Sequence, residues 1–436
     1  MKATKPDTLA GWGRVATARQ TLLRPNDRNL PLAAIDHGTL LPYGLGRSYG
    51  DVALNDGGHA LLTRGLDRFI AFDAVNGLLQ AEAGVTLDEV LEIVVPRGWF
   101  PAVTPGTRFV TLGGALANDV HGKNHHVAGC FSAHVTRFEL LRSDGERRLC
   151  LPDDPWFQAS AGGLGLTGLI TWLEIRLQRV DNPWVTVETT KFGNLDEYFE
   201  LDQASAAKWP YTVAWIDCAA RGPALGRGIY LAGKHAPPET SPPAFRRSRL
   251  DVPCMPPFSL VNTPVLRAFN FLYYRLPRRR QGSSHYEPFF YPLDHVRNWN
   301  RIYGPRGFHQ YQFVVPHDGA RAALGEVLAR VAASGQGSFL AVLKTFGNLR
   351  SPAMLSFPRP GVTLALDFPN RGAATKSLFT TLDGIVRQAG GALYPAKDAC
   401  MRGDDFRRAY PAWESFQSYV DPCFSSDFWR RVSQRE

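Results

Sequence analysis

The sequence predicts an α+β protein built from two domains, and three observations support this prediction. The chain has 436 residues, which is enough for two hydrophobic cores. Residues 37–180 alternate short apolar runs with glycine-rich loops. Residues 181–391 change to strands of alternating polarity interleaved with helices, and this pattern favours an antiparallel sheet covered by helices.

One helix of the first part is marked by its N-terminus. Thr86 is followed three residues later by Glu89, the capping-box pattern in which each side chain bonds the backbone N–H of the other residue. Apolar residues then recur at helical spacing, at Leu87, Val90, Leu91 and Val94. Gly98 ends the run, so we expect one amphipathic helix here.

Alternation of residue types predicts three strands in the second part, at 309–315, 339–344 and 362–368. Side chains that share a strand face are Gln310, Gln312 and Val314, then Leu340, Val342 and Lys344, and then Thr363, Ala365 and Asp367. Helices are expected at 320–331 and 376–389, and Gly390 is expected to follow the second helix in the left-handed conformation.

The composition is that of a globular protein with a basic charge balance. The hydrophobic fraction is 44% and the mean hydropathy is −0.19. The 49 Lys and Arg residues against 40 Asp and Glu give a net charge of +9, which favours anionic partners. Residues 1–14 lack the apolar stretch of a signal peptide, and no run reaches the roughly 20 apolar residues of a membrane-spanning helix. We expect a cytoplasmic protein, or one bound peripherally to the inner face of the cell membrane.

Residues 236–284 differ from the rest of the chain. A Pro-rich stretch leads into a short aromatic helix, for which Thr263 is the expected N-cap and Pro264 the first helical residue. The basic run Arg278–Arg280 follows the helix. This composition is typical of a segment that lies on a membrane surface. A lid packed on its own domain, with solvated arginines, is the alternative. We expect no nucleic-acid partner, because no recognised binding module accompanies the charge.

Two glycine-rich loops suggest a bound cofactor. Tyr43–Asp51 and Thr104–His126 combine glycines with basic and hydrogen-bonding side chains. Glycine allows backbone N–H groups to approach a ligand closely. Two such loops in one domain fit a large, flat, phosphate-bearing cofactor, and a flavin dinucleotide fits better than a mononucleotide. For the small residues 113–117, close helix packing is the alternative interpretation.

A third glycine-rich segment, residues 163–168, matches the GxGxxG pattern. The dinucleotide-binding fingerprint requires a helix directly after this pattern. Residues 169–177 alternate β-branched and aromatic residues with polar ones, which predicts a strand. A glycine turn that contacts a cofactor through its backbone is therefore favoured over a Rossmann fold.

The spacing of cysteines and histidines does not favour a metal site. His121, His125 and His126 are accompanied by Gly122 and Asn124, which favour a loop, and no nearby carboxylate completes a ligand set. This loop either covers the reactive face of a cofactor or holds structural histidines. The cysteines form no closely spaced pair, so free thiols are expected at Cys130, Cys150, Cys218, Cys254, Cys400 and Cys423.

Two lysines, Lys344 and Lys397, stand in apolar surroundings. Burial of a lysine costs several kcal/mol unless its charge meets an anion or an acceptor. Two explanations remain open. The lysines form structural pairs with carboxylates such as Asp367 or Asp398, or they lie beside a flavin, stabilise its reduced ring and hold a substrate oxygen.

Several motifs together resemble the vanillyl-alcohol-oxidase superfamily of FAD enzymes. They are GLGRSYGD at 44–51, PGTRFVTLGG and DVHGKNHH within 105–126, GLTG at 165–168, WNRIYGPRGFHQYQFVVP at 299–316, LDFP at 366–369 and LYPAKD at 393–398. The resemblance covers nearly the whole chain. It implies a PCMH-type FAD-binding domain over 7–180, a substrate domain on an antiparallel sheet over 181–391, and a segment 392–436 that returns to the FAD domain.

The resemblance also implies roles for single residues. Catalytic roles fall to Lys397, His121 and Tyr49, and the residue that accepts the proton stays open. FAD contacts fall to Gly44, Gly46, Arg47, Ser48, Tyr49, Gly106, Thr107, Gly113, Gly114, Ala117, His121, Gly168, Tyr394 and Lys397. Substrate contacts fall to Lys123, Trp215, Gln310, Gln312, Lys344, Phe346, Thr363 and Ala365. Many members attach FAD to a histidine in the first loop; this loop has none, so non-covalent FAD is expected.

The implied activity is FAD-dependent oxidation of a secondary hydroxyl. The expected substrate is the 2′-hydroxyl of a polyprenylphosphoryl pentose such as decaprenylphosphoryl-β-D-ribose. The keto sugar would need an NAD(P)H-dependent reductase to complete an epimerisation to arabinose. The alternatives are a soluble sugar, alditol or aldonolactone oxidase, and a non-catalytic flavin-binding protein. Some members have Cys, Asn and Tyr where this chain has Ala365, Thr363 and Phe290, so a similar but not identical pocket is expected.

Overall fold

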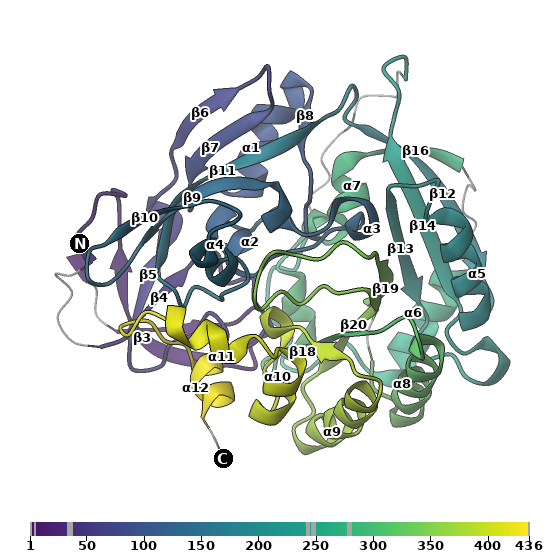
Figure 1. Ribbon diagram of the computed structural model, residues 1–436. Coiled ribbons are helices and arrows are strands. Elements are labelled where there is room, and N and C mark those ends of the chain that lie inside the picture. Colours follow the sequence, from purple (N-terminus) through teal and green to yellow (C-terminus); the bar gives the residue numbers. More distant parts are fainter. Residues whose placement is uncertain are drawn as a thin grey trace.

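The computed structural model describes residues 2–3, 6–32, 38–240, 245, 250–276, 281–337 and 339–434. Figure 1 shows two lobes side by side. The N-terminal lobe, purple to blue, carries two sheets, and the second lobe, teal to green, is built on one large sheet. The C-terminal helices, in yellow, return below the N-terminal lobe. The predicted α+β class is confirmed.

The first sheet of the N-terminal lobe has the order β1-β3-β5-β4, and β2 pairs with β3 at its side. Strands β3, β5 and β4 run parallel, whereas β1 and β2 pair with β3 in antiparallel register. The strands are β1 (Lys2–Ala3), β2 (Asp7–Ala10), β3 (Thr17–Arg24), β4 (Leu40–Tyr43) and β5 (His59–Leu62). The loop that follows β4 is the first glycine-rich loop.

The second sheet of this lobe is antiparallel, with the order β10-β9-β11-β7-β6 and β8 beside β11. Its strands are β6 (Phe69–Asp73), β7 (Leu78–Glu82), β8 (Trp99–Pro101), β9 (Val135–Leu141), β10 (Arg147–Cys150) and β11 (Leu169–Arg179). Strand β11 follows the GxGxxG turn directly, as predicted. This antiparallel strand leaves no place for the helix that a Rossmann fingerprint needs.

Helices α1 and α2 of the N-terminal lobe contact the second sheet, and α3 contacts β19 of the other lobe. Helix α1 (Leu87–Val94) has the predicted capping box, with Thr86 as its N-cap and Glu89 bonding back. Gly98, with φ at 78°, ends the following 3-10 turn in the left-handed region. The remaining helices are α2 (Leu112–Ala117), α3 (His125–Ala128) and α4 (Pro155–Ser160). The prediction of a loop was wrong for 125–128, because these residues form one helical turn; His121–Asn124 do lie outside helices and strands.

The second lobe is built on an antiparallel eight-stranded sheet with the order β16-β12-β14-β13-β19-β20-β18-β21. The strands are β12 (Trp184–Phe192), β13 (Tyr211–Ile216), β14 (Gly228–His235), β16 (Gln281–His285), β18 (Phe308–Val315), β19 (Ala341–Phe346), β20 (Gly361–Pro369) and β21 (Ala392–Leu393). Two short parallel strands, β15 (Leu250–Asp251) and β17 (Val296–Arg297), form a separate pair.

The three predicted strands of this lobe are present, with shifted ends. The second begins at Ala341 rather than at 339 and continues to Phe346. Helices α5 (Leu195–Ser205), α8 (Ala320–Ser334) and α9 (Ala373–Gln388) cover the outer face of the sheet (Figure 1). Gly390 follows α9 with φ at 68°, as predicted. Tyr311 packs against Phe379 of α9 and donates its hydroxyl to Asp383, so Tyr311, Phe313 and Val315 lie on the face of β18 that meets this helical layer. The opposite face of β18 is therefore turned toward the N-terminal lobe.

The C-terminal segment connects the two lobes. Strand β21 pairs with β18 of the large sheet, and the 3-10 turn η8 (Pro395–Lys397) follows it. Helices α10 (Gly403–Ala409), α11 (Trp413–Phe416) and α12 (Asp427–Ser433) then reach the N-terminal lobe. There Arg431 forms an ion pair with Asp51 at 2.8 Å, and the backbone N–H of Leu40 donates to Cys423. These contacts support the proposed return of 392–436 to the first domain; the boundaries at 180 and 391 stay a proposal.

Helix α6 (Thr263–Arg275) occupies the expected place, but its cap differs from the prediction. The N-cap is Asn262, whose side chain accepts the backbone N–H of Val265, so Pro264 is the second helical residue. The prediction overlooked that Asn is at least as good an N-cap as Thr. The basic run 278–280 lies outside the described residues. Among the residues that the structure describes, no helix is both long and apolar enough to span a bilayer.

Candidate active site

A cavity of about 320 Å³ lies between the two lobes. The N-terminal lobe contributes both glycine-rich loops and the glycine turn before β11. The second lobe contributes β18, β19 and β20, and the C-terminal segment contributes η8. The residues that line it include Trp12, Gly44, Gly46, Arg47, Ser48, Tyr49, Gly106, Thr107, Gly113, Gly114, Ala117, Asn118, His121, Gly168, Asp294, Gln310, Gln312, Leu340, Val342, Lys344, Ala365, Tyr394 and Lys397.

The first glycine-rich loop follows β4 and lies along the cavity. Gly46 has φ at 60°, the left-handed region that favours glycine. A Cβ on Gly44 would lie 2.6 Å from Oγ1 of Thr111, and a Cβ on Gly50 would overlap the carbonyl oxygen of Asp398. Glycine therefore allows this loop to lie against both the second loop and the C-terminal segment.

The second loop leads into α2. Thr111 is the N-cap of this helix and its Oγ1 accepts the backbone N–H of Gly114 at 3.2 Å. Gly113 lies against Ala83 of the neighbouring segment, where a Cβ would come within 2.8 Å of the Ala83 methyl group. The small residues thus serve close packing as well as the cavity wall, so both interpretations of 113–117 hold.

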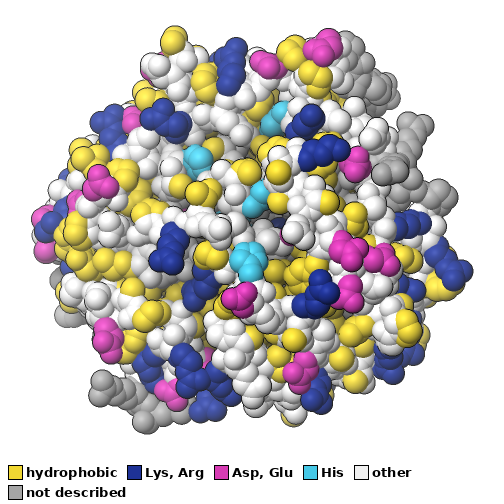
Figure 2. Space-filling view, turned by 45° about the vertical axis from the view of Figure 1, so that its right-hand side comes forward, with side chains coloured by type: hydrophobic (Ala, Val, Ile, Leu, Met, Phe, Trp, Pro, Cys, Tyr) yellow, Lys and Arg dark blue, Asp and Glu magenta, His cyan; other side chains and the backbone are white. Residues whose placement is uncertain are grey.

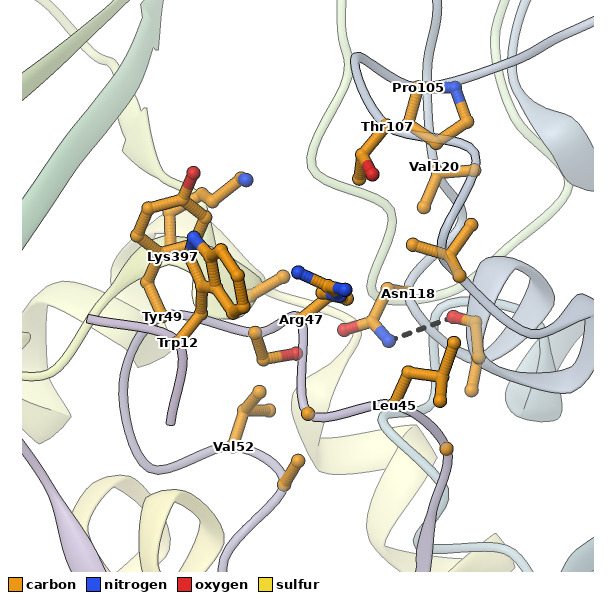
Figure 3. Close-up of a pocket in the computed structure, with 18 of the residues that line it drawn as sticks. Trp12, Leu45, Arg47, Tyr49, Val52, Pro105, Thr107, Asn118, Val120 and Lys397 are labelled. Carbon is orange, nitrogen blue, oxygen red and sulfur yellow. Dashed lines mark hydrogen bonds between the residues drawn. The ribbon is translucent and has the colours of Figure 1, made fainter. Parts of the chain in front are cut away.

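Three buried polar atoms on the cavity wall have no hydrogen-bond partner among the described residues. They are Nε of Arg47, Oδ1 of Asn118 and Nδ1 of His121. Figure 3 shows Arg47 between Trp12 and Asn118, and the Asn118 amide donates to the Gly114 carbonyl at 2.9 Å. The Arg47 guanidinium lies 4.1 Å from the Trp12 ring centroid. Buried polar atoms normally have partners, so these atoms fit a polar ligand such as a flavin dinucleotide along this wall.

His121 is positioned by β18. Its Nε2 lies 3.2 Å from the amide nitrogen of Gln312, which can only donate. Nε2 is therefore the acceptor, and the proton of a neutral ring is on Nδ1. Burial lowers the pKa of His121 well below its usual value, and the charges of Lys344, His125 and Lys397 lower it further. The ring is uncharged at neutral pH.

Three half-buried lysines lie near this histidine. Lys397, on η8, has its Nζ 4.0 Å from the Tyr49 ring centroid, and Figure 3 shows the two side chains together. Burial lowers the pKa of Lys397 to about 7 and that of Lys344 to about 8. Lys123 donates to the Phe290 carbonyl at 3.1 Å, and burial, then the Lys344 charge, lower its pKa to about 7. Neutral and charged forms of these amines therefore coexist near neutral pH.

Asp367 is the buried carboxylate of this region. It is 0% exposed, accepts the Gln310 amide at 2.6 Å and accepts the Tyr303 hydroxyl at 3.4 Å. Burial raises its pKa to about 7, and the Lys397 charge lowers it. Asp398 instead pairs with Arg431 at 3.0 Å. Of the two carboxylates considered for the lysines, Asp367 is the one beside Lys397.

The structure brings most of the predicted site residues together. The fourteen positions expected to contact FAD all line the cavity, as do Gln310, Gln312, Lys344 and Ala365 from the substrate set. This placement confirms that Gln310 shares a face with Gln312, and Leu340 and Val342 with Lys344; Val314, predicted on the same face of β18, does not line the cavity. The remaining four substrate positions do not line the cavity. Lys123 donates to the Phe290 carbonyl, and the Thr363 hydroxyl accepts the Gln312 amide at 3.3 Å. The ring centroid of Phe346 lies 4.9 Å from that of His121, and the Trp215 indole donates to the Phe339 carbonyl at 2.9 Å.

Sequence reasoning missed Trp12, Asn118 and Asp294 on the cavity wall. The two glycines that flank Trp12 in the sequence were a signal of close packing. In the structure, a Cβ on Gly13 would overlap the Phe308 carbonyl oxygen. The backbone of this segment bonds both Ser48 and Phe308, which fixes Trp12 beside the first loop. Nothing local marked Asn118 or Asp294. No cluster of three or more His, Cys, Asp or Glu suited to a metal ion occurs among the residues that the structure describes.

Charge on the face seen in Figure 2 is mixed. Lys and Arg side chains alternate there with Asp, Glu and apolar groups, and histidines gather around the middle of the view. The net charge of +9 does not form one continuous basic surface on this face. The positive charge that bears on the site comes from Arg47 and from Lys123, Lys344 and Lys397.

Comparison with known proteins places this geometry in a family. Residues 30–150, which contain both glycine-rich loops, match the model of an FAD binding domain. The chain is 36% identical over 98% of its length, and 98% of the relative, to decaprenylphosphoryl-β-D-ribose oxidase of Mycolicibacterium smegmatis. The chain belongs to this family of FAD-dependent oxidoreductases. Within the family it also resembles an uncharacterised protein of Streptomyces coelicolor, with 34% identity over 80% of this chain and all of that protein.

A more distant similarity is confined to part of the chain. D-2-hydroxyglutarate dehydrogenase of Escherichia coli is 34% identical over 24% of this chain and 10% of that enzyme. Family membership confirms the expected FAD cofactor and an oxidoreductase that acts on a CH–OH group. The flavin fits the cavity observed here, because the glycine loops and the three unpartnered polar atoms lie in or beside the matched segment.

Proposed function

We propose that this enzyme oxidises the 2′-hydroxyl of a polyprenylphosphoryl pentose, such as decaprenylphosphoryl-β-D-ribose, to the 2-keto sugar. The observation that carries the proposal is the buried Lys397, which lines the cavity of an FAD enzyme whose full-length relative is named as a ribose oxidase of this kind. The oxidation is the first half of an epimerisation to arabinose.

The residues proposed to hold FAD are the two glycine-rich loops and their neighbours. Arg47, with one unpartnered nitrogen, is suited to the pyrophosphate, and the glycines give the backbone access to the flat parts of the cofactor. Asn118 offers an unpartnered acceptor farther along the wall. When bound, FAD supplies the acceptor for the two electrons and the carbon-bound hydrogen of the alcohol.

Lys397 is the proposed acceptor of the hydroxyl proton. A general base works best with a pKa near the working pH, and burial lowers the pKa of Lys397 to about 7. Tyr49 is a poor base, because burial raises its pKa well above 10 and its hydroxyl stays protonated. His121 is a weaker base than Lys397, because its pKa is lowered well below its usual value. We propose that Tyr49 and His121 orient the hydroxyl.

The remaining polar groups of the cavity are proposed to hold the sugar. Gln310 and Gln312 share one face of β18, and Lys344 lies on β19 across β20 from them. Thr363 is proposed to position the side chain of Gln312, because its hydroxyl accepts a hydrogen bond from the Gln312 amide. Ala365 leaves room beside these side chains. Charged Lys344 would meet the substrate phosphate, since its Nζ has a long contact of 3.5 Å to the Gly122 carbonyl oxygen and no ion pair among the described residues.

The exposed face of α6 is proposed to contact the membrane. Large apolar side chains between 39% and 65% exposed occur on this helix and in residues 250–260 before it: Leu250, Met255, Phe258, Leu260, Val265, Phe269, Phe271, Leu272 and Leu276. Arg267 and Arg275 are also exposed on this helix. Aromatic, apolar and basic side chains together are typical of a helix lying on an anionic bilayer. Trp215 and Phe339 pack against α6 and connect it to the cavity region.

Co-sedimentation with anionic vesicles tests this surface. The wild-type protein is expected in the pellet, and the double variant Phe258→Ser, Leu272→Ser is expected in the supernatant. Val75→Ser, at a residue 86% exposed in the N-terminal lobe, is the matched control and is expected to pellet. If the double variant pellets like the wild type, this surface does not bind the membrane.

A substrate panel tests the activity. Under anaerobic conditions we expect polyprenylphosphoryl-β-D-ribose to bleach the flavin faster than free ribose, alditols or aldonolactones. Faster bleaching by a free sugar, alditol or lactone would instead favour the soluble oxidase, and no bleaching by any donor would favour a flavin-binding protein without activity. Addition of an NAD(P)H-dependent keto-sugar reductase is expected to convert the product to the arabinose epimer.

A further inference from the structure

We propose that Asp367 is a positioning residue for the proton transfer: its carboxylate is the buried counter-charge that Lys397 needs when it takes the hydroxyl proton. This inference rests on the proposed function. In the step, the O–H bond of the substrate breaks and an N–H bond forms at Nζ, while the electron pair and hydrogen of the carbon leave for FAD. The chain then holds a new buried cation, which is costly unless an anion lies beside it.

The fold brings the carboxylate and the amine to the two sides of one strand, because β20, which carries Asp367, and the η8 turn, which carries Lys397, both contact β18. Asp367 lies on β20, directly opposite Gln310 of β18 in the antiparallel register. On the other side of β18, the Tyr394 backbone N–H donates to the Gln312 carbonyl at 2.9 Å, which holds the η8 turn that carries Lys397. The hydrogen bonds from Gln310 and Tyr303 hold Asp367 in place.

Of the three lysines near the site, Lys397 is the one whose pKa is shifted by a carboxylate. The Asp367 charge raises the pKa of Lys397, and the Lys397 charge lowers the pKa of Asp367. For Lys344, burial alone accounts for the lowered pKa. The other titratable and charged groups that bear on the pair are Tyr49, Tyr303, Lys344 and His121, with Arg47 and Asp294 acting beyond Tyr49. Asp367 is thus the anion that offsets the neighbouring cations and burial at Lys397.

Amine labelling measures the effect without substrate. The protein, with and without FAD, is treated with an acylating reagent at a series of pH values, and mass spectrometry follows the Lys397 peptide. The wild-type midpoint is expected near 7. In Asp367→Asn, which is nearly isosteric, the midpoint is expected to fall by about one to three pH units. The acidic limb of flavin bleaching by the substrate is expected to move in the same direction.

Asp383→Asn is the matched control. Asp383 is also a carboxylate whose pKa burial raises to about 7, but it accepts the Tyr311 hydroxyl at 2.7 Å on the helical side of the sheet. Its removal is expected to leave the Lys397 midpoint unchanged. Tyr303→Phe removes one hydrogen-bond donor to Asp367 and keeps the aromatic ring. Because the carboxylate is then less stabilised, the Lys397 midpoint is expected to fall, by less than in Asp367→Asn. This variant replaces Asp367→Asn if the latter does not fold.

The results test the role of Asp367 and the proposed function separately. An unchanged Lys397 midpoint in folded Asp367→Asn, or in Tyr303→Phe if the first variant is unfolded, overturns the role of Asp367. Failure of the substrate to bleach the wild-type flavin overturns the proposed function instead, because the labelling midpoint requires no substrate. A midpoint that falls equally in Asp383→Asn also overturns the proposal, since the effect would then be general.

Discussion

Replacement of Lys397 by Met tests the assignment of the proton acceptor. The thioether has a similar length and keeps the packing against Tyr49, but it cannot take a proton. Loss of a general base costs about 10²- to 10⁴-fold in rate, or about 3–5 kcal/mol of transition-state stabilisation. FAD should remain bound in Lys397→Met, because the other predicted FAD contacts on the cavity wall are unchanged.

The structure also gives the pH dependence of this step. Because burial lowers the pKa of Lys397 to about 7, about one tenth of the amine is neutral at pH 6 and about nine tenths at pH 8. The rate of anaerobic flavin bleaching should therefore rise about tenfold per pH unit below 7 and level off above it. Stopped-flow absorbance of the flavin measures both effects, and Lys376→Met, at an exposed lysine on α9, is the control. A rate in Lys397→Met within about threefold of wild type would show that Lys397 is not the proton acceptor.

Three further predictions follow from the cavity. Ala117→Phe should fill the wall at the end of α2 and abolish FAD binding without lowering the melting temperature of the flavin-free protein; the control Ala322→Phe, on an exposed position of α8, should retain FAD, and retention by both would contradict the assignment. Acid precipitation should release all flavin into the supernatant, because the loop Tyr43–Asp51 has no His or Cys; yellow pellets would show covalent attachment. The flavin-free protein should become more stable from pH 7 to 9, since Lys123, Lys344 and Lys397 bind fewer protons folded than unfolded; a flat thermal-melting profile would argue against buried amines.

Sequence periodicity predicted which side chains share a face but not what faces them. The alternation in β18 placed Gln310 and Gln312 together, and the structure puts both on the cavity wall. The same reasoning put Asp367 on a face of its strand, yet the choice between Asp367 and Asp398 as partner of a lysine stayed open. Arg431, near the C-terminus, forms an ion pair with Asp398, and this leaves Asp367 as the carboxylate that acts on Lys397. The sequence around the lysines does not show this contact.

Contacts between distant segments account for the other gaps. Trp12 meets Arg47 because the Gly-Trp-Gly segment bonds both the first loop and β18, and no local pattern encodes this. The helix over 263–275 was predicted well, but its cap was misplaced by one residue because two adjacent side chains, Asn262 and Thr263, are both good caps. The motifs of the glycine loops carried the cofactor assignment. Gly50 and Gly113 are required by close packing against neighbouring segments, whereas a Cβ on Gly106 would meet open space.

We propose that C2 of a polyprenylphosphoryl ribose is oxidised in this FAD cavity. The most direct measurement is a single anaerobic turnover with substrate deuterated at C2, followed by flavin absorbance and mass spectrometry of the product. We predict one reduced FAD per chain, slower bleaching than with unlabelled substrate, and a keto sugar that has lost the deuterium. An unreduced flavin, or a product that keeps the deuterium, would contradict the account.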